Sequence, residues 1–372
     1  FGQRNDDHAG LGDWVANPER LPNGIKGLSE RIEAMGIKFG LWFEPEMTNK
    51  DSDLYRAHPD WILHTPGRNA SHGRYQYVLD FSRKEVVEYI YEMMAKILSE
   101  AKVSYIKWDM NRSITECYSV ALPADRQGEV FHRYILGVYD LYERLTSEFP
   151  EVLFESCSSG GGRFDPGMLY YAPQGWTSDD SDAIERLKIQ YGTSLCYPIS
   201  SMGSHVSVIP NHQVFRKTPL HTRANVAYFG TFGYELDLNS LKEEEIAEVK
   251  EQIIFMKKYR KLFQFGDFYR LKSPFEGNET IWMVVSEDKK TAIVGYYRTL
   301  NGVNQAYSRI KLQGLDPDML YENILNKTEN YGDELMNFGL ITTDVTAGEV
   351  PGDATPCTDF ESRIYILKAK EK

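Results

Sequence analysis

The sequence predicts an α/β protein, a (β/α)8 barrel followed by a small antiparallel β-sandwich domain. Strand and helix patterns alternate from about residue 25 to residue 240, which predicts parallel strands joined by helical crossovers. Seven such units fit an eight-stranded barrel better than an open sheet, with the first barrel strand expected upstream of Phe1. After about Phe265 the pattern changes to short β-rich runs, so we expect the barrel in residues 1–264 and the β domain in residues 265–372.

Each predicted barrel strand is a short apolar run that ends in polar residues, and each predicted helix repeats apolar residues at intervals of three and four. The helix RKEVVEYIYEMMAKILSEA is the clearest example. The expected strands are residues 37–46, 75–81, 103–110, 152–157, a short one that ends at 176–180, 197–205 and 231–238. The expected helices are residues 26–35, 83–101, 127–148, 183–195, 219–229 and 243–261.

The last hundred or so residues read as antiparallel strands. The runs are IWMVVSED, TAIVGYYRT, RIKLQGL and SRIYILKA, and the turn signals EGN, LNG and NYGDE lie between them. Short strands of this kind, separated by turn residues, are typical of a small antiparallel β domain.

The composition excludes several classes of protein. A net charge of -12 argues against nucleic acid or an anionic membrane as a partner. No apolar run approaches the roughly 18 residues that a membrane span needs. Cys117, Cys157, Cys196 and Cys357 form no CxxC pair, which argues against a zinc site and favours free thiols in the reducing cytoplasm.

The candidate functional residues lie at the ends of predicted strands, where barrel enzymes carry their active sites. Several carboxylates at one rim, with aromatic residues among them, are typical of a pocket that binds a polyol and carries out acid–base chemistry. The candidates are Trp42, Glu44, Glu46, Asp80, Lys107, Asp109, Asn111, Glu155, Cys157, Arg163, Trp176, Asp179, Asp180 and Asp182.

Two carboxylates with separated pKa values are the minimum that glycoside hydrolysis requires. Lys107 and Asp109 are two positions apart and share one face of their strand, where the lysine would lower the pKa of the carboxylate. Asp179, Asp180 and Asp182 crowd like charges together, which raises the pKa of at least one of them. This interpretation makes Asp109 the nucleophile and one of the three clustered aspartates the acid.

Structural interpretations of these residues stay open at this point. Lys107 and Asp109 could form a buried ion pair with no chemical role. TSDDSDA could begin a helix near residue 183, with Ser178 or Asp179 as its N-cap, since both residue types are favoured there.

Three further features have simple interpretations. Glu44 and Glu46 could be one inward contact and one residue at the rim. The DDH phrase at 6–8 could be a metal site or a solvated loop. CSSGGGR at 157–163 resembles a phosphate-binding nest but lacks the GxxxxGK[ST] pattern.

Five phrases together resemble the α-galactosidases of glycoside hydrolase family 36. In chain order they are FGQRNDDHAGLGDW, LWFEPEM, KWDMNR, ESCSSGGGRFDPGMLYY and WTSDDSDAIERLKIQYG. The resemblance covers nearly the whole chain. It implies a (β/α)8 barrel, a C-terminal antiparallel β domain, and a retaining mechanism with a covalent galactosyl-Asp intermediate.

The resemblance also implies roles for individual residues. Asp109 in KWDMNR matches the position of the family's nucleophile, and Asp179, the first aspartate of SDDSDA, matches its acid/base. The residues implied to bind substrate are Trp42, Arg74, Lys107, Asn111, Cys157, Ser158, Gly160, Trp176 and Asp182.

The expected substrates are small oligosaccharides of the melibiose and raffinose type with a terminal α-1,6-linked galactose. No metal or organic cofactor is expected, nor are nucleic acid or membrane partners. The family resemblance further implies a homo-oligomer, with a tetramer expected for the full-length family.

The family also carries sequence that this chain lacks. A DDGW phrase ends the first barrel strand directly before the FG that begins this sequence, and a large β-sandwich precedes that strand. Alternative functions are a galactosyl transglycosylase or an α-N-acetylgalactosaminidase on the same scaffold, or an inactive sugar-binding fragment.

Overall fold

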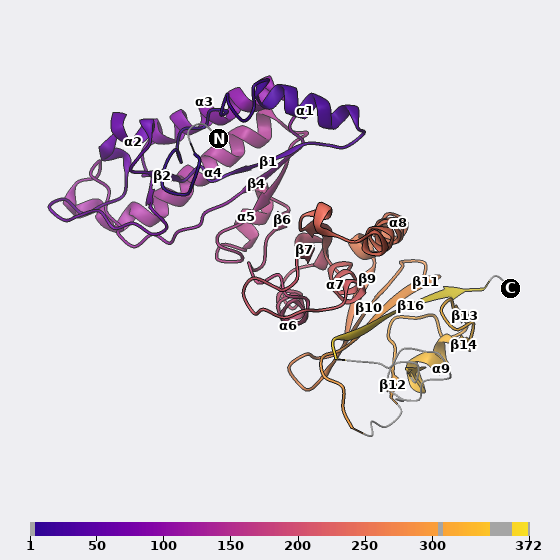
Figure 1. Ribbon diagram of the computed structural model, residues 1–372. Coiled ribbons are helices and arrows are strands. Elements are labelled where there is room, and N and C mark those ends of the chain that lie inside the picture. Colours follow the sequence, from indigo (N-terminus) through magenta and orange to yellow (C-terminus); the bar gives the residue numbers. More distant parts are fainter. Residues whose placement is uncertain (1–3, 304–307, 343–358, 371–372) are drawn as a thin grey trace. The chain divides into compact units, whose positions relative to one another are not determined.

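The computed structural model describes residues 4–303, 308–342 and 359–370 (Figure 1). The chain divides into two compact units, Phe1–Trp176 and Thr177–Lys372. The domain border expected near residue 265 coincides with the end of a long helix in the second unit, α8 (Glu243–Phe265); that border stays a prediction.

A four-stranded parallel sheet with the order β1-β4-β5-β6 forms the centre of the first unit. All three neighbouring pairs are parallel, so the C-terminal ends of the strands meet at one edge of the sheet. The strands are β1 (Gly40–Phe43), β4 (Tyr105–Trp108), β5 (Leu153–Ser156) and β6 (Gln174–Gly175).

Helices cover one face of this sheet and bury its apolar side chains (Figure 1). In α3 (Lys84–Glu100) the buried residues Val86, Ile90 and Met94 recur every four positions, so a single stripe of the helix enters the core. Alternate residues of a strand point to opposite faces, and Trp108 of β4 points to the helical face. The helices are α1 (Gly24–Ala34), α2 (Asp53–Ala57), α3, α4 (Val130–Glu148) and α5 (Pro166–Tyr171).

The strand expected at residues 75–81 does not belong to the parallel series. Its ordered part, β3 (Gln76–Val78), pairs antiparallel with β2 (Met47–Asn49), and β1 pairs directly with β4. A parallel connection needs a crossover long enough to cover the sheet, but the only α-helix between β2 and β3 is α2, with 5 residues. The polypeptide therefore folds back on β2 instead.

The second unit contains a pair of parallel strands, β7 (Gly203–Ser207) and β8 (Thr231–Glu235). The strand expected at 197–205 begins later, because residues Ile199–Ser201 form a 3-10 turn directly after Pro198. Two shorter helices of this unit are α6 (Ala183–Thr193) and α7 (Leu220–Ala227).

The antiparallel domain is built on a six-stranded sheet with the order β14-β13-β16-β11-β10-β9. A small pair, β12 (Arg309–Ile310) and β15 (Leu340–Ile341), packs Ile310 and Leu340 into the same apolar core. The other elements are β9 (Asp267–Lys272), β10 (Glu279–Val285), β11 (Thr291–Arg298), β13 (Leu320–Asn323), β14 (Glu329–Tyr331), α9 (Gly332–Asn337) and β16 (Glu361–Ala369). Within the described ranges, every helix falls short of the length and apolarity that a membrane crossing requires.

The packing of α4 gives a stability test. A Cβ atom added to Gly137 would lie 1.9 Å from the carbonyl oxygen of Phe81. We expect Gly137→Ala to lower the free energy of unfolding by roughly 1–3 kcal/mol, because overpacking outweighs the gain in helix propensity. Gly192 of α6 has nothing within 4 Å of the same position, and Gly192→Ala should raise stability by up to about 1 kcal/mol. Urea denaturation measures both, and equal effects would contradict the prediction.

Candidate active site

The register of the parallel sheet brings three predicted site residues into one row. Trp42 of β1 lies opposite Lys107 of β4, and Lys107 lies opposite Glu155 of β5. Trp108 points the other way and stacks on Tyr142 of α4, with ring centroids 3.9 Å apart. The row therefore occupies the face of the sheet that the helices do not cover.

Asp109 follows β4 directly and is held by donors on several sides. The indole Nε1 of Trp42 donates to its Oδ2 over 3.0 Å, and Nδ2 of Asn111 donates to the same oxygen over 2.8 Å. The backbone N–H of Met110 donates to Oδ1 over 2.9 Å. Only 7% of Asp109 is exposed, so this carboxylate is both oriented and largely shielded from water. Such a group is suited to nucleophilic attack at one defined position.

Lys107 forms an ion pair with Glu155 of the neighbouring strand. The Nζ atom lies 3.6 Å from Oε1 of Glu155 and 4.8 Å from the ring centroid of Trp176. Glu155 also accepts hydrogen bonds from Tyr105 and from Nε2 of Gln174. The parallel register could have indicated this partner, because adjacent strands place Lys107 and Glu155 side by side.

The loop after β5 brings a buried thiol to the same place. Burial and the nearby Asp109 carboxylate raise the pKa of Cys157, although Lys107 acts in the opposite direction. The loop then reverses at Gly160, where φ is 86°, a conformation that glycine adopts without strain. The Ser158 hydroxyl donates to the Met110 carbonyl over 3.3 Å, which ties this loop to the segment that carries Asp109.

Neither of the two glutamates that follow β1 is a rim residue, because Glu44 is 1% exposed and Glu46 is 0% exposed. Arg163 donates to both oxygens of Glu46 over 2.7 and 2.9 Å, and Trp108 and Tyr134 also donate to them. Burial alone would raise the pKa of Glu46, but these partners, Arg163 above all, hold it below the usual value. Glu46 is a structural ion-pair residue.

Glu44 forms no ion pair within the described part of the chain. Its Oε1 accepts from the backbone N–H of Asn111 over 2.7 Å, and its Oε2 accepts from Nε2 of Gln76 over 2.9 Å. Burial raises the pKa of Glu44 to about 7; the Asn111 hydrogen bond opposes the rise, Asp109 adds to it, and Arg74 opposes it. Among these residues, the side chain of Glu44 therefore changes its charge near neutral pH.

Arg74 sits at the tip of a tight hairpin turn. Gly73 and Gln76 bridge across the turn, and the two central residues, Arg74 and Tyr75, have φ of 51° and 60°. Asparagine and glycine are the usual residues at such positions, so this turn stores strain of a kind found at functional sites. The carbonyl of Tyr75 accepts from Nδ2 of the buried Asn49 over 2.8 Å, which fixes the turn.

In the second unit, the aspartate cluster precedes α6, and its members have different environments. Asp182 is the N-cap: its Oδ2 accepts from the N–H groups of Ile184 and Glu185 and pairs with Arg216. The interpretation that Ser178 or Asp179 caps this helix was wrong, because the helix begins one residue after Asp182. Substrate contact by Asp182 stays a prediction.

Asp179 and Asp180 differ in exposure. The Oδ1 atom of Asp180 accepts from the N–H of Asp182 over 3.0 Å, so its carboxylate helps to shape the turn. Asp179 is exposed, and its backbone carbonyl accepts from Nε2 of Gln213 over 3.1 Å. Of the three clustered aspartates, Asp179 is the exposed one.

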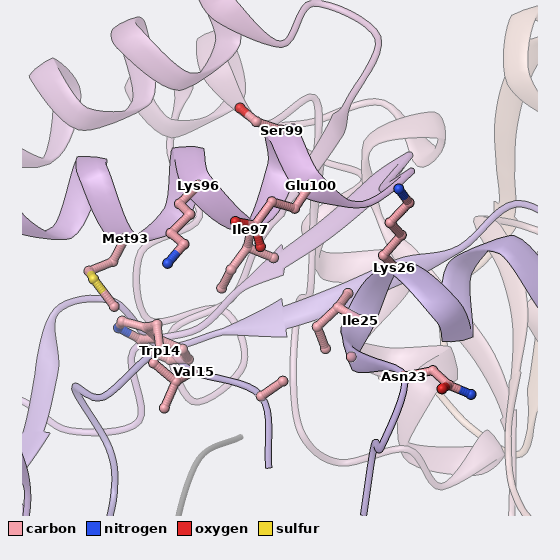
Figure 2. Close-up of a pocket in the computed structure, with 12 residues that line it drawn as sticks. Trp14, Val15, Asn23, Ile25, Lys26, Met93, Lys96, Ile97, Ser99 and Glu100 are labelled. Carbon is pink, nitrogen blue, oxygen red and sulfur yellow. The ribbon is translucent and has the colours of Figure 1, made fainter. Parts of the chain in front are cut away.

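A separate hollow of about 490 Å³ lies between α1, α3 and the segment around Trp14 (Figure 2). Figure 2 shows Met93 and Ile97 of α3 facing Trp14, with Ile25 and Lys26 of α1 nearby. None of the predicted site residues line it. Its lining residue Trp14 lies near Trp42, with ring centroids 6.4 Å apart.

Two family models match separate parts of the chain. Residues 1–266 match the melibiase family, and residues 279–367 match the C-terminal domain of glycosyl hydrolase family 36. The chain belongs to glycosyl hydrolase family 36. The predicted fold class, a barrel followed by an antiparallel β domain, is confirmed by this membership and by the solved structures that the chain matches.

Two curated family 36 relatives show the extent of the match. The chain is 56% identical over 374 residues to α-galactosidase AgaA of Geobacillus stearothermophilus, which covers 100% of this chain and 49% of AgaA. It is 48% identical over 369 residues to α-galactosidase Mel36A of Lactobacillus acidophilus, which covers 99% of this chain and 49% of Mel36A. The chain therefore spans about half the length of the curated relatives it matches.

Solved family 36 structures match equally well. The crystal structure of an AgaA variant in complex with raffinose has a TM-score of 0.94 and 52% identity, and the match covers 100% of this chain and 50% of AgaA. The α-galactosidase from Lactobacillus brevis has a TM-score of 0.96 and 50% identity, with the same coverage.

The raised pKa of Glu44 predicts how the free energy of unfolding depends on pH. The folded state raises this pKa from 4.5 to about 7, so the stability that Glu44 contributes when protonated is present below pH 4.5 and is lost as the pH rises to about 7. Relative to the wild type, Glu44→Gln should therefore gain roughly 3 kcal/mol of stability between those two pH values. Urea unfolding of both proteins across this range measures the difference. A difference that does not change with pH would contradict the prediction.

Proposed function

We propose that the protein is a retaining exo-α-galactosidase that releases terminal α-1,6-linked galactose from oligosaccharides of the melibiose and raffinose type. The observation that carries the proposal is the shielded carboxylate of Asp109, held by Trp42 and Asn111 at the end of β4. The family to which the chain belongs supports the substrate class, because relatives at 48% and 56% identity are named α-galactosidases. Solved AgaA variants are described in complex with raffinose and with stachyose.

In the proposed reaction Asp109 attacks the anomeric carbon of galactose while Asp179 gives its proton to the departing glycosidic oxygen. A bond between carbon 1 and the Asp109 oxygen forms as the glycosidic bond breaks. Asp179 then takes a proton from water, the water oxygen attacks carbon 1, and Asp109 leaves as a carboxylate. Two displacements at one carbon return the original anomeric configuration.

The remaining proposed roles follow from the side chains around Asp109. Lys107, placed between Glu155 and the ring of Trp176, would donate hydrogen bonds to galactose hydroxyls, as would Arg74. Trp176 and Trp42 offer aromatic surface for the sugar ring. Cys157, Ser158 and Gly160 would bring the loop after β5 close to the sugar.

We also propose that the protein works in the cytoplasm as a homo-oligomer, without a metal or organic cofactor. Cys117, Cys157 and Cys196 are free thiols, which suits a reducing compartment. The oligomer is proposed from the family resemblance alone.

The nucleophile assignment can be tested by chemical rescue. We expect Asp109→Gly to lower the turnover of an aryl α-galactoside by about 10³-fold or more. Azide should partly restore turnover by entering the vacated space, and β-galactosyl azide should be the product. Asp109→Asn fills that space without supplying a nucleophile, so it should be inactive with or without azide. A folded Asp109→Gly protein that azide fails to rescue would argue strongly against Asp109 as the nucleophile.

The stereochemistry of the first product tests the two-step mechanism independently. We expect α-galactose to appear first, followed by slow mutarotation, because a covalent intermediate requires two inversions. Proton NMR of the anomeric region during the first turnovers measures this. Initial release of β-galactose would indicate an inverting enzyme and overturn the retaining mechanism.

A further inference from the structure

One buried carboxyl beside Asp109 has no part in the proposed reaction. Glu44 follows β1, the strand that carries Trp42, and only 1% of it is exposed. Its oxygens accept from the backbone N–H of Asn111 and from Nε2 of Gln76. Both partners are neutral donors, so both oxygens of Glu44 act as acceptors, an arrangement that the ionised carboxylate favours because protonation weakens one of the two acceptors.

Asn111 connects this carboxylate to Asp109. Its backbone N–H donates to Glu44 over 2.7 Å, and its side-chain Nδ2 donates to Oδ2 of Asp109 over 2.8 Å. The position of the amide depends on the backbone from which it extends, and Glu44 holds that backbone. Trp42, two residues before Glu44, donates to the same oxygen of Asp109 over 3.0 Å. Both side-chain donors to Oδ2 therefore depend on the segment that ends β1.

We infer that Glu44 is a positioning residue for Asp109, acting through Asn111. The inference rests on the proposed function, because it gives Glu44 a part in the orientation of the proposed nucleophile. Glu44 touches neither the sugar nor the reacting atoms in this proposal. Its part is to keep the Asn111 amide aimed at Asp109.

The neighbouring Glu46 shows what a purely structural carboxylate looks like at this strand end. Arg163 binds both of its oxygens, and that ion pair keeps Glu46 charged. The charged groups that act on Glu44 are Asp109 and Arg74, which have opposite effects. Arg112 lies near the other partner of Glu44, since it donates to the carbonyl of Gln76. Glu44 is thus left to titrate near neutral pH, with a pKa of about 7 that burial chiefly causes.

Protonation of Glu44 would disturb this arrangement. One acceptor oxygen becomes a donor and then faces the N–H of either Asn111 or Gln76. If the proton sits on the Asn111 side, that N–H faces a weaker acceptor and the segment after Asp109 is held less firmly. On the Gln76 side, a half-turn of the amide would present Oε1, which is buried and has no hydrogen-bond partner within the described residues. The ionised form is the one in which both hydrogen bonds hold as observed.

The test compares three variants with the wild type on an aryl α-galactoside. Glu44→Gln should lower kcat about 10- to 100-fold, with KM changed less than about threefold, because misorientation of a reacting group acts on the transition state. The wild-type kcat should rise as the pH passes through about 7, and this inflection should be absent from Glu44→Gln. The double variant Glu44→Gln with Gln76→Glu exchanges the two groups, and should recover most of kcat together with an inflection.

Glu46→Gln is the matched control, since it neutralises the other buried carboxylate of the same segment. It should lower the melting temperature through loss of the Arg163 pair and keep the inflection in kcat. If Glu44 had only a structural role, Glu44→Gln would also keep the inflection in kcat, and it would lose activity and stability together. The positioning role instead predicts a loss of kcat in a Glu44→Gln protein that is at least as stable as the wild type above about pH 7.

The outcomes separate the two proposals. A Glu44→Gln enzyme with the kcat and the pH profile of an active wild type overturns the inference and leaves the proposed function standing. A wild type that releases no galactose from an aryl α-galactoside overturns the proposed function, and the positioning role with it. Loss of kcat and of the inflection, with recovery in the exchanged double variant, supports the inference.

Discussion

The parallel register of β1, β4 and β5 is the constraint on which the candidate active site depends. It sets Trp42, Lys107 and Glu155 side by side on the face that the helices do not cover. The same register ends the three strands at one edge, so Asp109 and the Cys157 loop emerge next to each other. Helix packing on the other face, with Trp108 against Tyr142, keeps the register from slipping, because a shift by one residue would turn the apolar side chains outward.

Near this row, two buried glutamates differ in charge state because their partners differ. Glu44 and Glu46 are two positions apart and both buried, and Glu46 forms an ion pair with Arg163. Burying a charge is costly unless a partner compensates for it. Glu46 consequently stays ionised as part of the framework, whereas burial brings the pKa of Glu44 to about 7.

In the second unit, the clustered aspartates likewise differ in their partners. Asp182 uses its carboxylate to cap α6 and to pair with Arg216, and Asp180 supports the turn before it. These hydrogen bonds and the ion pair fix the loop before α6, in which Asp179 is the exposed aspartate.

Local pattern was sufficient to predict the alternation of helices and strands, the change to antiparallel strands after residue 265, and the placement of Asp109 at a strand end, because these follow from short-range periodicity. Pairing between distant segments was not predictable in this way: β3 joins β2 rather than the parallel sheet, and Lys107 pairs with Glu155 of the adjacent strand. The titration of Glu44 near neutral pH is also a tertiary property. It comes from burial, to which the Asp109 charge adds and which the Asn111 hydrogen bond and Arg74 oppose, and no stretch of sequence contains those neighbours together.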